Sequence, residues 1–179
     1  GVQGGSVLAT RLLGVLYAMG LGVERDWSAA LAYVSDAAQS GVPAAMRELA
    51  MLLFAGDPDD QDGAALIAAA APGDPVAGAI AVRRYCEGRA HADVESAKTH
   101  LALLERAQYP RAPELRAAFE GREAGAPVKA DFPDWDKIAA KLAEEPSVPQ
   151  LKPEVLCQSP PARSFRSAFS PEECEYVIA

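Results

Sequence analysis

Four glycines recur along the first two thirds of the chain, and their spacing is the strongest constraint on its fold. Gly20, Gly56, Gly88 and Gly121 lie 36, 32 and 33 residues apart, and an apolar or aromatic residue precedes each of them by two or three positions. A period near 34 residues is typical of stacked helix-turn-helix units, in which each unit buries its apolar side against its neighbours. The spacing therefore predicts a helical repeat protein, with each glycine ending the first helix of a unit.

The first unit shows two helices with a short turn between them. In its first helix, apolar side chains recur at the spacing of an amphipathic helix: Leu8, Leu12, Val15, Leu16 and Met19. Asp26 is expected to cap the second helix, because its carboxylate can accept from the unpaired N–H groups of the first turn. The apolar stripe of that helix comprises Trp27, Ala30, Leu31, Val34 and Ala38. Many alanines, with Gly14, allow the two backbones to approach closely, as in an αα-hairpin.

The same pattern predicts three hairpins and one further helix. We expect the hairpins to pair residues 8–19 with 26–39, 43–54 with 62–71, and 75–87 with 93–108, and a fourth first helix over 113–123. Pro43, Pro75 and Pro113 then stand at helix starts, where the missing N–H is not needed. The predicted fold class is all-α, a short right-handed αα-hairpin solenoid with a capping helix and an extended C-terminal tail.

The composition changes after Gly125, where prolines become frequent. We expect residues 1–124 to hold the repeats and residues 125–161 to form a Pro-rich linker, extended from 146 onward. Within it, Trp135, Ile138 and Leu142 recur at helical spacing, which predicts a helix over 134–144. Because the last unit of a stack needs a cover for its apolar face, this helix is expected to cap the open end of the solenoid.

The charge balance excludes several classes of partner. The formal charge of −8 and the sequence pI near 4.8 argue against a nucleic-acid surface, which needs a net basic patch. The sequence has no uninterrupted apolar run of about 18 residues, so no membrane span is expected. Three distant cysteines, Cys86, Cys157 and Cys174, suit neither a metal knuckle nor a disulfide framework. A cytoplasmic protein with reduced thiols is expected.

One set of residues in the first unit matches a known repeat pattern. These residues are Leu13-Gly14, Leu16-Tyr17, Gly20, Gly22-Val23, Asp26, Ala29-Ala30, Ala37-Ala38, Gly41 and Ala44-Ala45. They resemble the Sel-one-like repeat, a relative of the tetratricopeptide repeat. The second and third units lack the Gly-x-Gly-Val turn, and the third has Arg84-Tyr85 where Leu-Tyr is usual. The resemblance implies an adaptor or scaffold without catalysis of its own.

The end of the chain carries a second pattern. Ser170-Pro171-Glu172-Glu173 is a capping box, and residues 164–169 before it alternate as a short strand would. With Phe165, Phe169, Cys174 and Val177-Ile178, these residues resemble the opening of a prolyl 4-hydroxylase-like 2-oxoglutarate/iron(II) dioxygenase domain. The resemblance implies that residues 162–179 are the truncated start of such a domain, whose longer parent would use iron(II), 2-oxoglutarate and ascorbate. A capping box before any amphipathic helix looks similar, so both interpretations stay open.

A candidate iron site within the repeats is rejected. His91-Ala92-Asp93 matches the His-x-Asp pair of that dioxygenase family, but it falls in a predicted turn, whereas an iron triad needs a rigid strand. The other histidine, His100, lies in the following helix, and Asp93 is better explained as its N-cap. Neither a nucleophile constellation nor a phosphate-binding loop is present. No catalytic residue, metal ligand or cofactor is therefore predicted in these residues.

Four arginines are the candidate partner-binding residues. Counted back from the repeat glycines, Arg11 and Arg47 hold the ninth position, and Arg83 and Arg116 the fifth. These positions differ by four and therefore share a helix face. A row of guanidinium groups would suit an acidic segment, because guanidinium pairs with carboxylate in bidentate fashion. Alternatively, the face is half-buried and the arginines only extend their charged ends to solvent.

Three functions follow from these observations as alternatives. The first is a protein-interaction scaffold that binds a protein or peptide, an acidic one if the arginines hold it. The second is an N-terminal substrate-presenting or regulatory arm of a 2-oxoglutarate/iron(II) dioxygenase. The third is oligomerisation alone, since stacked repeats with open ends associate readily.

Overall fold

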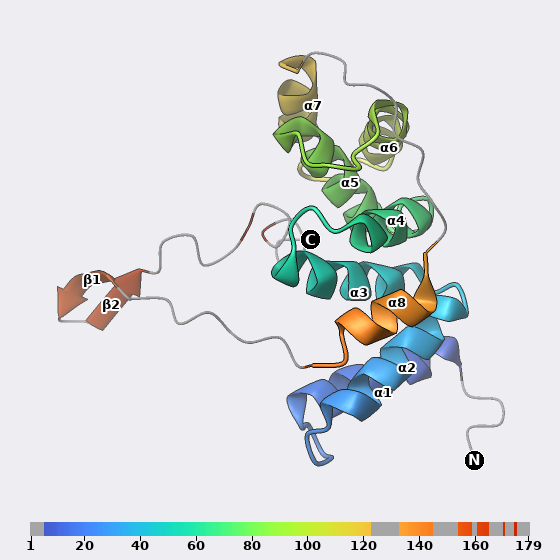
Figure 1. Cartoon of the computed structure of the whole chain (residues 1–179). Helices are drawn as coiled ribbons and strands as arrows, with labels where there is room; N and C mark the ends of the chain where they lie inside the picture. The colour runs from blue at the N-terminus through green and yellow to red at the C-terminus, as the bar shows by residue number, and fades with distance from the viewer. Residues whose placement is uncertain are drawn as a thin grey trace.

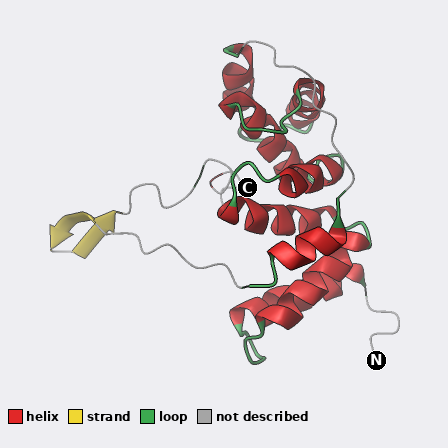
Figure 2. Ribbon diagram, in the orientation of Figure 1, coloured by secondary structure: helices red, strands yellow, loops and turns green. Residues whose placement is uncertain are grey.

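The structure, a computed structural model, describes residues 6–122, 133–144, 154–158 and 161–164, together with Ser170 and Cys174. All regular secondary structure in the described residues up to 144 is helical (Figures 1 and 2). The helices are α1 (Val7–Met19), α2 (Trp27–Gln39), α3 (Pro43–Gly56), α4 (Gln61–Ala70), α5 (Pro75–Glu87), α6 (Val94–Arg106), α7 (Ala112–Glu120) and α8 (Trp135–Lys141). The all-α prediction is confirmed for this part of the chain.

Successive helices pack in pairs, as the periodicity predicts. α1 packs on α2, α3 on α4 and α5 on α6, and the pairs meet where α2 contacts α3 and where α4 contacts α5. α7 packs on α5 and α6. The polypeptide thus builds a row of helix pairs in the order of the sequence, as Figure 1 shows from α1 to α7.

Local capping chemistry sets the ends of these helices. Gly20 and Gly88 adopt the left-handed conformation with φ of +68° and +75°, which ends α1 and α5 at a position that glycine occupies without strain. Asp26, Asp60 and Asp93 cap α2, α4 and α6, and each carboxylate accepts from the N–H three residues on, at 3.0, 2.8 and 2.7 Å. The predicted cap at Asp93 is confirmed.

α1 and α2 approach each other closely at Gly14. A Cβ atom added to Gly14 would stand 2.5 Å from Val34 Cγ2 and 3.0 Å from the Ala30 carbonyl oxygen. No larger residue fits without separating the two helices, so the approach depends on glycine.

The buried side chains form two apolar clusters. The first spans α2 to α5 and includes Leu49, Leu66 and Ile80, all fully buried, and α8 contributes Ile138 and Leu142 to it. The second joins α5, α6 and α7 through Tyr85, Leu101, Leu104 and Leu115, among others.

α1 is a helix as predicted, but its apolar stripe points outward. Leu8, Leu12 and Met19 are 59, 56 and 62% exposed, whereas the buried residues of α1 are Thr10 and Gly14. The small residues of α1 face α2, because only they permit the close approach of the two backbones. Tyr17 of α1 also packs on α2, by stacking on Tyr33, whereas Leu8, Leu12 and Met19 are left on the exposed side.

The prediction that residues 134–144 cap the open end beyond α7 is wrong. α8 instead folds back onto the first two helix pairs, where Figure 1 shows it in orange across α2 and α3. The indole Nε1 of Trp27, at the start of α2, donates to the Leu142 carbonyl oxygen at 3.0 Å. The apolar face of α8 is thus buried against α2 to α4 and not against the last repeat.

The C-terminal region contains one element that the sequence did not indicate. β1 (Glu154–Gln158) and β2 (Pro161–Ser164) pair antiparallel with an irregularity between Val155 and Cys157, in a segment where an unpaired extended linker was expected. The strand expected over 164–169 lies, beyond Ser164, outside the described residues. At the expected helix start, the Cys174 N–H donates to the Ser170 carbonyl oxygen at 2.9 Å.

Candidate protein-interaction site

α8 docks on the preceding helices through both apolar and charged contacts. α8 presents Ile138 and Leu142, four residues apart and 1% and 4% exposed, to the first apolar cluster, and Trp135 packs beside them. The α8 docking site comprises this part of the cluster, Trp27 at the start of α2, and the carboxylates of Asp60 and Asp62 at the start of α4. One amphipathic helix is therefore held by its apolar face and by polar groups at its edge.

Charged groups fix α8 at one edge of the site. Lys141 Nζ bonds to Asp60 Oδ2 and lies 2.6 Å from Asp62 Oδ2, and Lys137 Nζ lies 2.9 Å from the same Asp62 oxygen. Asp60 and Asp62 are only 7% and 6% exposed. Because Lys137 and Lys141 are four residues apart, both side chains lie on one face of α8 and reach the same acidic pair.

The ion pairs between α8 and the start of α4 shift the pKa values of Asp62 and Lys141. Burial alone would raise the pKa of Asp62, but the hydrogen bonds from Lys141 and Lys137 outweigh it and leave the pKa below its ordinary value of 3.8. Burial likewise acts to lower the pKa of Lys141, and the bonds to Asp60 and Asp62 outweigh it and raise the pKa. Both shifts favour the charged forms that hold α8 in place.

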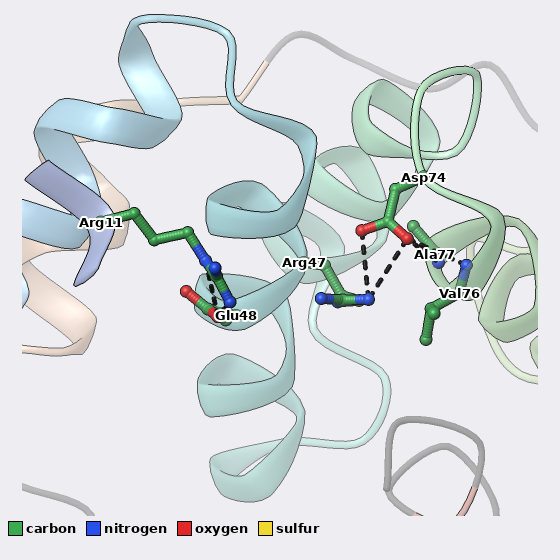
Figure 3. Close-up of polar contacts among 6 residues, drawn as sticks. All are labelled: Arg11, Arg47, Glu48, Asp74, Val76 and Ala77. Atoms are coloured by element: carbon green, nitrogen blue, oxygen red, sulfur yellow. Dashed lines mark hydrogen bonds and ion pairs between the residues drawn. The ribbon is translucent and has the colours of Figure 1, made fainter. Parts of the chain in front are cut away.

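Arg11 and Arg47, two of the predicted partner-binding residues, bond to carboxylates of their own chain (Figure 3). Arg11 Nε on α1 donates to Glu48 Oε1 on α3 at 2.9 Å. Arg47 Nη1 on α3 lies 3.1 Å from Asp74 Oδ2, and Asp74 also caps α5 by accepting from the Val76 and Ala77 N–H groups. The neighbouring residues Arg47 and Glu48 thus connect α3 to both adjacent helix pairs.

The other two predicted arginines occupy different surroundings. Arg83 is half-buried on α5 and lies close enough to Cys86 to oppose the rise in that thiol's pKa. Arg116 on α7 forms an exposed bidentate pair with Glu105 on α6, with Nε at 2.7 Å and Nη2 at 2.5 Å from the two oxygens. The row of four arginines as a surface for an acidic partner stays a prediction.

Arg84 is a buried arginine. From the sequence it is seen only as a departure from the repeat pattern. It is 2% exposed, and its guanidinium donates to the carbonyl oxygens of Pro58 at 2.8 Å and Ala90 at 3.4 Å. Its Cζ lies 3.8 Å from the centroid of the Phe54 ring, within cation–π range. Arg84 therefore ties the turn after α3 to the turn after α5.

Burial shifts the pKa values of two side chains of types that serve in catalysis, Cys86 and His100. No cluster of three or more His, Cys, Asp or Glu side chains able to hold a metal ion occurs among them. Burial raises the pKa of the Cys86 thiol, which disfavours a nucleophilic thiolate at neutral pH. Burial lowers the pKa of His100, which lines a cavity of about 440 Å³ between the α4–α5 turn and α6.

Comparisons with known proteins do not place the chain in a family. No protein-family model matches it, and no curated protein sequence and no solved structure was found to be similar to it. Within the described ranges, none of the helices has both the length and the hydropathy needed to cross a bilayer.

Replacing Arg47 with Met is expected to destabilise the protein, because the change leaves the Asp74 carboxylate buried without its cation. The expected loss is about 2 to 3 kcal/mol in the free energy of unfolding, measured by urea denaturation. Arg116→Met is the matched control, since its ion pair is exposed and such pairs contribute little. Equal effects of the two substitutions would contradict the role of Arg47 as a link between helix pairs.

Docking of α8 is expected to weaken in acid. A carboxyl group whose pKa is lowered by folding stabilises the folded form fully above its ordinary pKa, and this contribution is lost as the pH falls through the lowered pKa. Both tryptophans of the chain, Trp27 and Trp135, lie at this contact, so their fluorescence reports on docking. We expect a red shift of the emission below about pH 4.

The same titration of Lys141→Met tests which ion pair is responsible. Without the Lys141 cation, only Lys137 opposes the effect of burial on Asp62, so the pKa of Asp62 should be higher than in the unmodified chain and the fluorescence change should begin at a higher pH. Coincident titration curves for the two proteins would show that the contact between Lys141 and Asp62 does not hold α8.

Proposed function

We propose that this chain is a protein-interaction scaffold, a short solenoid of Sel-one-like repeats that binds amphipathic helices at the α8 docking site. The observation that carries the proposal is α8 itself. Trp27 and Leu142, joined by one hydrogen bond, are 115 residues apart in the sequence. The first repeats thus bind a helix that comes from outside their own array, and they do so through side chains suited to a partner protein.

The chemistry of the site describes the helix it accepts. The apolar cluster takes two apolar residues four positions apart, as with Ile138 and Leu142, and the Asp60–Asp62 pair takes two cations at the same spacing. An amphipathic helix held by its apolar face is a common mode of peptide recognition. The site therefore selects a helix with a basic edge, and an acidic partner of the kind expected from the arginines would use a different face.

Regular capping supports the repeat assignment. The N-caps Asp26, Asp60 and Asp93 are 34 and 33 residues apart, which is the period expected of helix-turn-helix repeats. Each begins the second helix of a pair, and that repetition favours one structural unit used three times.

A peptide with the sequence of residues 134–144 is expected to bind once α8 has been released. Ile138→Asp places a charge in the apolar cluster and should free the docking site, because a buried unpaired carboxylate is strongly unfavourable. We expect fluorescence anisotropy to detect binding of the labelled peptide to this variant and not to the unmodified chain, in which tethered α8 competes at high effective concentration.

Two controls make the peptide experiment specific. A peptide with both lysines replaced by glutamate should not bind, since it would face Asp60 and Asp62 with like charges. Lys141→Glu in the chain provides a second way to release α8, and circular dichroism establishes that each variant keeps its helices. A variant that retains its helices yet does not bind the peptide would contradict the proposal.

A second candidate function is that of an N-terminal arm of a 2-oxoglutarate/iron(II) dioxygenase, in which the repeats present or regulate a protein substrate. The observation that favours it is the bond from the Cys174 N–H to the Ser170 carbonyl oxygen, which spans four residues as in a helix. This bond lies where the capping box of the resemblance expects a helix to begin.

Succinate release tests this second candidate. With 2-oxoglutarate, iron(II) and ascorbate, the chain of residues 1–179 is expected to release no succinate, and the full-length product of the same reading frame is expected to release it. Absence of turnover in both proteins would remove the support for the dioxygenase resemblance and leave the scaffold.

A further inference from the structure

Several large apolar side chains are exposed next to one another along α1. Leu8, Leu12 and Met19 are more than half exposed, and Val15 on the same stripe is half-buried. We call these four residues the α1 face. Contiguous exposed apolar surfaces of this kind mark interaction sites on soluble proteins.

The position of Leu12 is covered in the next two first helices, α3 and α5. Counted back from the glycine that ends each helix, the position of Leu12 is occupied by Glu48 in α3 and by Ile80 in α5. The Glu48 side chain is 12% exposed and bonded to Arg11 of the preceding pair, and Ile80 is 0% exposed. At Leu12, the α1 face therefore leaves exposed a position that is buried in α3 and α5.

The distribution of charge indicates what can cover this face. α1 contains no acidic residue, whereas each of the other described helices contains at least one. Its one charged side chain, Arg11, is bonded to Glu48. Because the chain has a formal charge of −8, two copies repel each other, and contact through the α1 face brings no acidic side chain of α1 into the interface.

The four residues of the α1 face have the same order of intervals when read in either direction along the helix. They follow one another at intervals of four, three and four, which is the alternation of a and d positions in a coiled coil. If two α1 helices pack antiparallel, Leu8 of one lies opposite Met19 of the other, and Leu12 lies opposite Val15. A patch that complements itself in this way fits a twofold axis, the commonest symmetry of protein oligomers.

We propose that a second copy of this chain covers the α1 face, and that the two α1 helices pack antiparallel about a twofold axis. Such a dimer carries two α8 docking sites, but its formation does not depend on the scaffold function.

The mass of the full chain in solution tests the proposal. Sedimentation equilibrium should give twice the monomer mass of 18.8 kDa for the unmodified chain, and Leu12→Glu should halve that value. Leu103→Glu is the matched control, because Leu103 is an exposed leucine on a different helix, 45% exposed, and its replacement should leave the dimer intact. Leu8→Glu provides a second variant at the α1 face, and circular dichroism establishes that each protein is folded.

A crosslink tests the antiparallel arrangement. A mixture of Leu8→Cys and Met19→Cys chains should form a disulfide-linked dimer on mild oxidation, and neither variant alone should form it to the same extent. A monomeric unmodified chain, a dimer that persists in both folded α1 variants, equal dissociation by Leu103→Glu, or a mass that keeps growing with concentration would each overturn the proposal.

Discussion

Helices in this protein meet at short range because alanine and glycine line the surfaces between them. Ala37, Ala38, Ala45 and Ala50 are completely buried, and Gly14 brings α1 so close to Val34 that not even a Cβ atom fits. Small side chains bury little apolar area, so each such contact contributes modestly to stability. The arrangement of the helix pairs consequently depends also on the larger groups at the contacts, which include both the buried leucines of the two apolar clusters and ion pairs.

Arg47 and Glu48 show how charged groups define the register between pairs. They are neighbours on α3, yet one bonds forward to the cap of α5 and the other backward to α1, as Figure 3 shows. Ion pairs of low exposure lose solvation energy when they form, so their net contribution to stability is smaller than their Coulomb energy. Their directional bonds nevertheless favour one alignment of three consecutive helix pairs. Contacts between alanine side chains alone would allow several alignments of similar energy.

The helices were predictable because the signals that begin and end them act within a few residues. Asp26, Gly20 and Pro75 each determine a helix end through a local contact or a fixed backbone angle, and the observed ends lie close to the predicted ones. The position of α8 was not predictable in the same way. Its stripe shows which face is apolar, but its ion partners are 79 and 81 residues away in the sequence.

The same limit applies to the arginines and to α1. Periodicity placed Arg11 and Arg47 on one face, but it could not show that acidic residues of the neighbouring helices lie within reach of both. Periodicity also identified the stripe of α1, but whether a stripe is buried depends on whether another helix lies beyond it. Arg84 departs from the repeat pattern in the sequence, but only the structure shows that it is buried between two turns.

The bond from Trp27 to Leu142 also affects how the chain folds. Stacked repeats form mainly local contacts, so they can fold in sequence as they leave the ribosome. Here α2 depends on α8, which follows it by about 100 residues. The apolar cluster that α2 belongs to is complete only when Ile138 and Leu142 have packed against it. Closing a loop of this length carries an entropic cost that grows slowly with the number of residues. The first two helix pairs therefore remain incompletely covered until residues 138–142 have been synthesised, and α8 then completes the burial of the first apolar cluster.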